Sequence, residues 1–241
     1  MNLYFLVEGA STEKKFYPAL IDSIFGGELT KVPTVDAVNE AENSFYILSA
    51  NGYPQIYTHI LKNSIEDVNQ YPLYNYLFVC LDADELTVEE RIAEFNEVYD
   101  RLAQSGTALN DHCEIVLIIQ QRCIETWFLG NKKFYKRNSA NSEMLDFHFF
   151  YNVKTNDPEL MGYAEDYETH ASYHYAYLKK MVSERRQVYS KKSAQSVCDE
   201  KYIAELINRN QIEKHMDTFG LLLNKLLEIK ERLHIYQADG R

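Results

Sequence analysis

The fold is decided by the apolar run Tyr-Asn-Tyr-Leu-Phe-Val-Cys-Leu at residues 74–81, which the acidic turn Asp-Ala-Asp-Glu at residues 82–85 follows directly. Apolar and aromatic side chains dominate the run, without the strict alternation of a strand that has one face in water. The run therefore predicts a strand that is buried on both faces, with carboxylates at its carboxyl end.

Two further runs have the same character, Asn-Leu-Tyr-Phe-Leu-Val at residues 2–7 and Glu-Ile-Val-Leu-Ile-Ile-Gln at residues 114–120. A shorter strand is predicted near residues 45–48. Helical patterns separate these runs, and Thr87 with Glu90 predicts a capping box at the start of the helix that follows the central run. Strands that alternate with helices indicate βα units in a parallel sheet.

The pattern changes beyond residue 130, where tyrosine becomes frequent and only a weak strand is predicted, near residues 147–153. Three helical patterns follow, at about residues 157–187, 193–208 and 210–233. We therefore expect an α/β, Rossmann-like fold with a mostly parallel sheet flanked by helices. Residues 1–130 would form this domain, and residues 131–241 a mainly helical extension packed on it.

The composition indicates a protein of the reducing cytoplasm. The amino-terminal run has no basic residue and is interrupted at Glu8, so we do not expect a signal peptide. No stretch approaches the ~20 apolar residues that cross a bilayer, so no membrane association is expected. The four cysteines show no metal-ligand spacing. A net charge of −11 argues against sequence-independent coating of nucleic acid, but not against an enzyme whose metal ions supply positive charge locally.

Acidic residues follow two of the predicted buried strands: Glu8 follows the first, and Asp82 and Asp84 follow the central one. The carboxyl ends of parallel strands meet at one edge of a sheet, so these side chains are expected to converge. Asp82 and Asp84 also have the period of a strand, which would place both carboxylates on one side. Carboxylate oxygens are the ligands that Mg²⁺ prefers. The alternative is that these are solvated acids of surface turns.

In their order and setting, these residues resemble a Toprim catalytic domain. The resemblance lies in Leu-Val-Glu-Gly at residues 6–9, Ser-Thr-Glu at residues 11–13 and Leu-Asp-Ala-Asp at residues 81–84. Glu-Lys-Lys-Phe-Tyr at residues 13–17 and Ile-Glu-Thr-Trp-Phe-Leu at residues 124–129 extend it. Together they make the chain similar to the RloB-like and OLD-like branch of prokaryotic Toprim proteins, many of which are encoded in anti-phage defence loci.

The resemblance covers roughly residues 2–130 and implies a Mg²⁺-dependent nuclease acting on DNA or RNA, with Mn²⁺ as the alternative ion. It assigns Glu8 as a metal ligand or general base, Asp82 and Asp84 as metal ligands, and Glu125 as a further catalytic acid. Glu125 could equally compensate a helix dipole. An ATPase partner and a homodimer are also implied. The alternative function is a non-catalytic, Toprim-fold regulatory subunit of a defence complex.

A basic segment that is rich in tyrosine is predicted to contact nucleic acid, because aromatic and cationic side chains alternate in nucleic-acid grooves. Its cationic residues are Lys179, Lys180, Arg185, Arg186, Lys191 and Lys192. The alternative is a packed helical face with a solvated rim. Glu13, at the start of the first helix, is expected to cap that helix rather than to enter the site.

Overall fold

The computed structural model describes residues 1–136 and 139–239. Within these residues, five parallel strands form one sheet in the order β2-β3-β1-β4-β5. The strands are β1 Asn2–Val7, β2 Thr30–Lys31, β3 Ser44–Ser49, β4 Tyr76–Asp82 and β5 Glu114–Gln120. The predicted α/β class with a parallel sheet is therefore confirmed.

Helices connect the strands and make up most of the second half of the chain. The α-helices are α1 Glu13–Phe25, α2 Leu61–Gln70, α3 Val88–Gln104, α4 Ile124–Phe128, α5 Ser142–Phe150, α6 His170–Ser183, α7 Glu200–Glu213 and α8 Asp217–Asp239. Short helical turns lie at η1 Val35–Glu40, η2 Ile56–Ile60, η3 Pro158–Leu160 and η4 Gln195–Val197. The predicted capping box of α3 is present, with Thr87 and Glu90 each accepting the other's backbone N–H.

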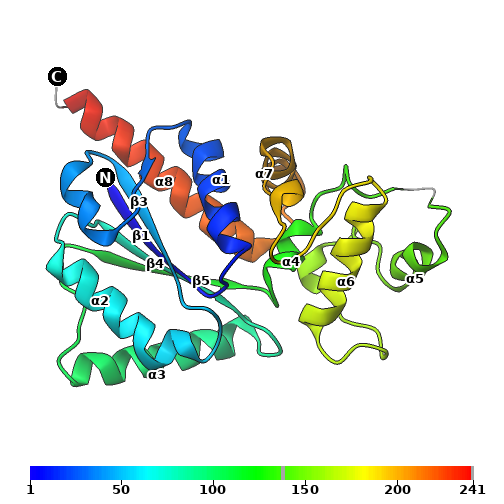
Figure 1. The fold of residues 1–241 in the computed structure, drawn as a ribbon, viewed down its shortest axis with the longest axis horizontal. Helices are drawn as coiled ribbons and strands as arrows, with labels where there is room; N and C mark the ends of the chain where they lie inside the picture. The colour runs from blue at the N-terminus through cyan, green and yellow to red at the C-terminus, as the bar shows by residue number, and fades with distance from the viewer. Residues whose placement is uncertain (137–138, 240–241) are drawn as a thin grey trace.

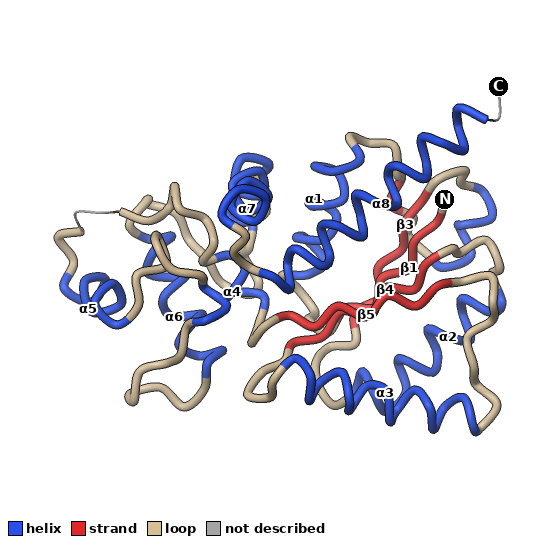
Figure 2. Tube along the Cα trace, turned by 180° about the vertical axis from the view of Figure 1, so that it is seen from behind, coloured by secondary structure: helices blue, strands red, loops and turns tan. Residues whose placement is uncertain are grey.

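Both faces of the sheet are covered, because successive side chains of a strand point to opposite faces. On β1, Phe5 belongs to the hydrophobic cluster that includes α1 and α8, whereas Tyr4 belongs to the cluster that includes α2 and α3. Figures 1 and 2 show the same arrangement, with α1 and α8 on one face and α2 and α3 on the other. Full burial of β1 and most of β4 follows from these two layers.

The later helices form a lobe beyond the carboxyl ends of the strands, where α4, α5 and α6 lie in Figure 1. One continuous hydrophobic cluster joins this lobe to the sheet: it contains Phe5 of β1, Trp127 of α4, Leu206 of α7 and Leu226 of α8. The helical extension therefore shares its core with the sheet. The boundary near residue 130 stays a prediction.

The structure differs from the sequence-based expectation in the lobe. The weak strand predicted at residues 147–153 is wrong, because α5 occupies most of this span; Asn141 caps the helix by accepting the backbone N–H of Met144. The long helix predicted at residues 157–187 is also shorter, since α6 begins only at His170. Among the described residues, no helix has the length and apolar character that spanning a membrane requires.

Candidate functional site

A cavity of about 210 Å³ lies at the carboxyl edge of the sheet. Glu8, which follows β1, and Asp82, which ends β4, both line it. Glu13 of α1, Glu125 of α4 and Lys191 complete its charged lining. We call this space the acidic cavity. Glu8 and Asp82 meet there because the carboxyl ends of neighbouring parallel strands share one edge, and Lys191 reaches the same space from the segment that follows α6.

Glu8 and Asp82 contact each other directly. The backbone N–H of Asp82 donates to Oε2 of Glu8 over 3.1 Å, so the end of β4 fixes the Glu8 carboxylate. Oδ1 of Asp82 is buried and has no hydrogen-bond partner among the described residues. Burial, together with the negative charge of Glu8 and Glu13, raises the pKa of Asp82 well above its usual value. Burial also raises the pKa of Glu8.

Glu13 enters the cavity, so the expectation that it only caps its helix is wrong. The N-cap of α1 is Thr12, and the Glu13 residue is 6% exposed. Its carboxylate lies against Gly9, where a Cβ atom would come within 2.1 Å of it, so the absence of a side chain at Gly9 provides the space. Burial, with a further contribution from Glu125, raises the pKa of Glu13 to about 7.

The segment that contains Lys191 is tied to the cavity by several hydrogen bonds. The Tyr189 hydroxyl donates to Oε1 of Glu125 over 2.8 Å, and the Thr12 hydroxyl donates to the backbone carbonyl of Lys191 over 3.1 Å. Nζ of Lys15 donates to the carbonyl of Lys192 over 2.7 Å. The negative charge of Glu125 raises the pKa of Lys191, with smaller contributions from other cavity acids. The lysine is thus a local counterion for the acids.

Asp84 does not line the acidic cavity. Its backbone is left-handed (φ 53°), so the two-residue period of a strand ends at Asp82 and no longer keeps the two carboxylates on one side. Oδ2 of Asp84 instead lies 3.4 Å from Nη2 of Arg91. Its charge still reaches the cavity, because it adds to the burial that raises the pKa of Glu8.

The turn that follows β4 is held by two residues that the sequence did not single out for this purpose. Nη1 of Arg122 donates to the carbonyl oxygens of Asp84 and Leu86, each over 3.1 Å. Nδ1 of His170 lies 2.7 Å from Oε2 of Glu85. Neither partner is adjacent to the turn in sequence, so only the folded chain reveals that Arg122 holds the backbone of Asp84 and that His170 holds the side chain of Glu85.

The predicted basic residues have different roles. Lys191 lines the acidic cavity. Lys180 instead pairs with Glu143. Arg185 donates from Nη2 to two backbone carbonyl oxygens, those of Lys133 over 2.6 Å and Tyr135 over 3.1 Å. Those two cations are engaged within the lobe. The remaining members of the predicted set are exposed: Lys179, Arg186 and Lys192. The predicted nucleic-acid contacts of these residues stay a prediction.

The residues of the cavity fit a Mg²⁺ ion. Mg²⁺ is commonly held by one or two carboxylates, with water and substrate phosphate as its other ligands. Glu8 and Asp82 offer two carboxylates, and the partnerless Oδ1 of Asp82 is an acceptor that a cation would satisfy. Within residues 1–136 and 139–239, no three His, Cys, Asp or Glu side chains are grouped closely enough to form a complete centre. The three-ligand set that includes Asp84 is therefore not assembled.

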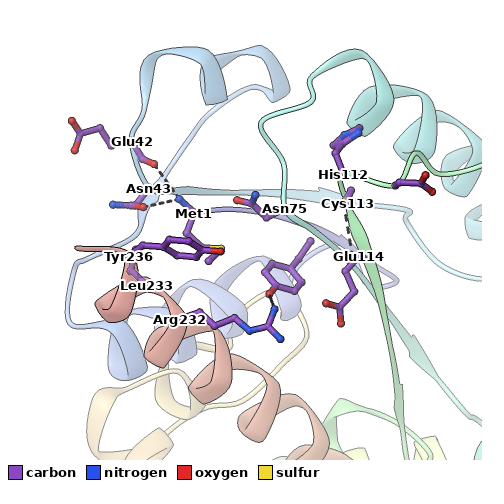
Figure 3. A pocket seen from close by; sticks show the side chains of 12 residues that line it. Met1, Glu42, Asn43, Asn75, His112, Cys113, Glu114, Arg232, Leu233 and Tyr236 are labelled. Carbon is purple, nitrogen blue, oxygen red and sulfur yellow. Dashed lines mark hydrogen bonds between the residues drawn. The ribbon is translucent and has the colours of Figure 1, made fainter. Parts of the chain in front are cut away.

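A second hollow, of about 610 Å³, lies at the opposite edge of the sheet, where β1 and β4 begin (Figure 3). Its polar groups bond to one another: Nη1 of Arg232 donates to the Tyr76 hydroxyl over 2.7 Å, and the amino group of Met1 donates to Oδ1 of Asn43 over 2.7 Å. The acidic cavity, with its unpartnered carboxylate oxygen, is the better candidate for chemistry.

In comparisons with models of protein families, with curated proteins and with solved structures, none matched this chain. The chemistry of the site therefore has to be inferred from its own geometry and charge.

Proposed function

We propose that this chain is a cytoplasmic, Toprim-type nuclease that uses Mg²⁺, or Mn²⁺ in its place, to hydrolyse phosphodiester bonds of DNA or RNA. One observation carries the proposal: Glu8 and Asp82, at the ends of neighbouring parallel strands, line a cavity with two more buried acids and face Lys191 across it. Clusters of carboxylates that raise one another's pKa are costly to the fold, and they are typical of functional sites.

Glu8 and Asp82 are the residues that would hold the ion. A bound Mg²⁺ supplies positive charge to a phosphate and acidity to a water molecule. Glu13, whose pKa of about 7 lies near neutral pH, can accept or release a proton at its carboxylate during hydrolysis. Tyr189 holds Glu125 in place through its hydroxyl.

Lys191 would bring the substrate to this acidic site. A net charge of −11 repels nucleic acid, and the cavity acids add to that repulsion at short range. An ammonium group at the rim of the same cavity offsets it where the scissile phosphate has to enter. Exposed Lys179, Arg186 and Lys192 would extend the positive charge along the bound strand.

A second function deserves a test because of Asp84. This carboxylate pairs with Arg91 outside the cavity, so one of the ligands that the resemblance implies is engaged elsewhere, which favours the non-catalytic alternative. The ATPase partner of that alternative is implied by the resemblance alone. The resemblance to RloB-like and OLD-like proteins supports a role in anti-phage defence for either function. The two functions differ in whether the purified chain cleaves nucleic acid by itself.

The experiment is a cleavage assay of the purified chain with plasmid DNA, single-stranded DNA and tRNA, in Mg²⁺, Mn²⁺ or EDTA. We expect cleavage with a divalent ion and none in EDTA. Asp82→Asn should abolish it with circular dichroism unchanged, whereas Asp100→Asn, on the exposed part of α3, should not alter it. Failure of every substrate would favour the regulatory function, and cleavage by Asp82→Asn would contradict the proposed site.

A further inference from the structure

Another cavity, of about 500 Å³, lies next to the acidic one, and we call it the Tyr53 cavity because Tyr53 and Tyr57 form its aromatic lining. Gly52 lines the acidic cavity, and the next residue along the chain already belongs to the Tyr53 cavity. Arg91 acts on both sides: its positive charge opposes the rise in the pKa of Glu8 in the acidic cavity, and its guanidinium lies 5.0 Å from the centroid of the Tyr53 ring. Consecutive residues of the chain thus line the two cavities, and neighbouring groups of one bound strand require such a placement.

The Tyr53 ring is exposed and yet firmly held. It is 48% exposed, which is unusual for an aromatic residue with so many partners. Its hydroxyl donates to Oε1 of Glu94 over 2.9 Å, and its ring meets that of Tyr57 edge-on at 5.9 Å. Arg91 adds a cation–π contact. An aromatic surface fixed in advance binds a flat ligand at a lower entropic cost than a mobile one.

Two buried polar atoms beside this ring have no hydrogen-bond partner among the described residues. They are the Tyr57 hydroxyl and Nε of Arg91, and the side chain of Arg91 is only 6% exposed. Buried polar atoms are nearly always partnered, so such atoms beside a cavity indicate a ligand or ordered water. Tyr57 also lies on η2, whose π-helical geometry is frequent at functional sites.

The chemistry of the cavity selects a base rather than a phosphate. Glu94, Glu97 and Arg101 line it, so carboxylates outnumber the one cation and disfavour a phosphate, whereas they accept hydrogen bonds from the amino groups of a base. The carboxylates do not repel the uncharged, planar ring of a base. The volume of about 500 Å³ lies in the range of roughly 300–1,000 Å³ that is usual for small-molecule sites.

We infer that the Tyr53 cavity binds a nucleobase that flanks the scissile phosphate, with the base stacked on the ring of Tyr53. This inference rests on the proposed nuclease function and adds to it a subsite that positions the strand. Stacking on an aromatic side chain tolerates every base, since each has a π face. The subsite would therefore raise the affinity for the strand and fix which phosphodiester bond lies in the acidic cavity. It would add only a modest preference for bases that carry an amino group.

Fluorescence polarisation tests the inference in the Asp82→Asn background, which prevents cleavage. The probes are fluorescein-labelled 12-nucleotide single strands of DNA and RNA, each also prepared with an abasic site at every position in turn. Tyr53→Ala should weaken binding by about 5- to 100-fold, as expected for the loss of one base stack. Tyr53→Phe keeps the ring and loses only the hydroxyl bond to Glu94, so it should retain most of the affinity. The control Tyr236→Ala, whose side chain is exposed on α8, should bind like the parent.

The abasic series gives a readout that needs no substitution of Tyr53. In the parent, the abasic site next to the cleaved bond should weaken binding, and in Tyr53→Ala the same abasic site should have no further effect. Equal binding of all abasic probes by the parent would overturn the inference and leave the nuclease function standing. Tyr53→Phe binding as weakly as Tyr53→Ala would also overturn it. If the parent binds no probe and cleaves no substrate, the proposed function fails first.

Discussion

Replacing Glu13 by glutamine should stabilise the metal-free chain, and the gain should depend on pH. The Glu13 carboxylate is buried beside Glu8 and Glu125, with Lys191 as the cation that faces it. Its pKa is therefore about 7 in the folded chain, against an ordinary value of 4.5. The folded chain holds more protons than the unfolded chain between these two values, so its free energy of unfolding falls as the pH rises through this window.

The size of the effect follows from the two pKa values. Each unit of pKa corresponds to ~1.4 kcal/mol, so ionised Glu13 costs the folded chain about 3 kcal/mol at pH 8. At pH 5 the cost is below about 1 kcal/mol, because the carboxyl group is mostly protonated in the folded chain. Glutamine keeps the shape of the side chain and removes the charge. The variant should therefore gain up to about 3 kcal/mol at pH 8 and much less at pH 5.

Urea denaturation in EDTA, at pH 5 and at pH 8, measures the difference. The matched control is Glu165→Gln, which removes a carboxylate that is exposed in the loop before α6 and should change stability little at either pH. A Glu13→Gln variant that is less stable than the parent by the same amount at both pH values would show that the carboxylate is a structural partner. That result would refute the account of the acidic cavity as a site of repelling charges.

Three further predictions concern the same site and its support. Gly9→Ala should leave the fold intact but displace the carboxylate of Glu13. In urea titrations, the free energy of unfolding of this variant should therefore depend less on pH, as expected of Glu13→Gln. An unchanged pH dependence would contradict this prediction. Lys191→Ala should weaken nucleic-acid binding and reduce by about one the slope of the logarithm of the binding constant against the logarithm of salt concentration. It should also tighten Mg²⁺ binding, which calorimetry measures. Nucleic-acid binding that is unaltered at every salt concentration would show that the lysine does not contact the substrate. Arg209→Ala should lower the free energy of unfolding in thermal or urea melts by about 1–3 kcal/mol for each carbonyl that loses its donor. The residue is 1% exposed, and its guanidinium donates to the carbonyl oxygens of Gly130 and Asn156. A loss below about 1 kcal/mol would show that water replaces it.

The sheet could be predicted from the sequence because its strands are buried on both faces. Continuous apolar runs of six to eight residues gave β1, β4 and β5 nearly to their ends, and the capping box gave the start of α3. The short edge strand β2 was missed because two exposed residues, Thr30 and Lys31, carry no such pattern. Residues 147–150 were misassigned because aromatic residues favour strands, whereas here the helix is set by the Asn141 cap and by the burial of Met144 and Phe147.

The candidate site was predictable only where strand ends define it. The alternation of strands and helices predicts that the strand ends bearing Glu8 and Asp82 share one edge of a parallel sheet. That β1 and β4 are direct neighbours is known only from the folded chain. The left-handed backbone at Asp84 and its pairing with Arg91 depend on the turn and on α3, and no local pattern signals them. Tyr189 reaches Glu125 from a segment 64 residues away, which only tertiary packing can bring about. Glu13 had one overlooked signal, a glycine four residues before it that leaves room for its carboxylate.

The position of α8 has a consequence for how the protein is made. This helix is synthesised after every strand of the sheet, yet Leu222, Leu226 and Ile229 on it belong to the same hydrophobic cluster as Phe5 and Phe78 of the central strands. On a ribosome, the sheet residues emerge well before the helix that covers them. The part of this face that α1 does not cover therefore stays open until α8 has emerged. We expect the nascent chain to expose this apolar surface in the meantime, and chaperones bind surfaces of this kind.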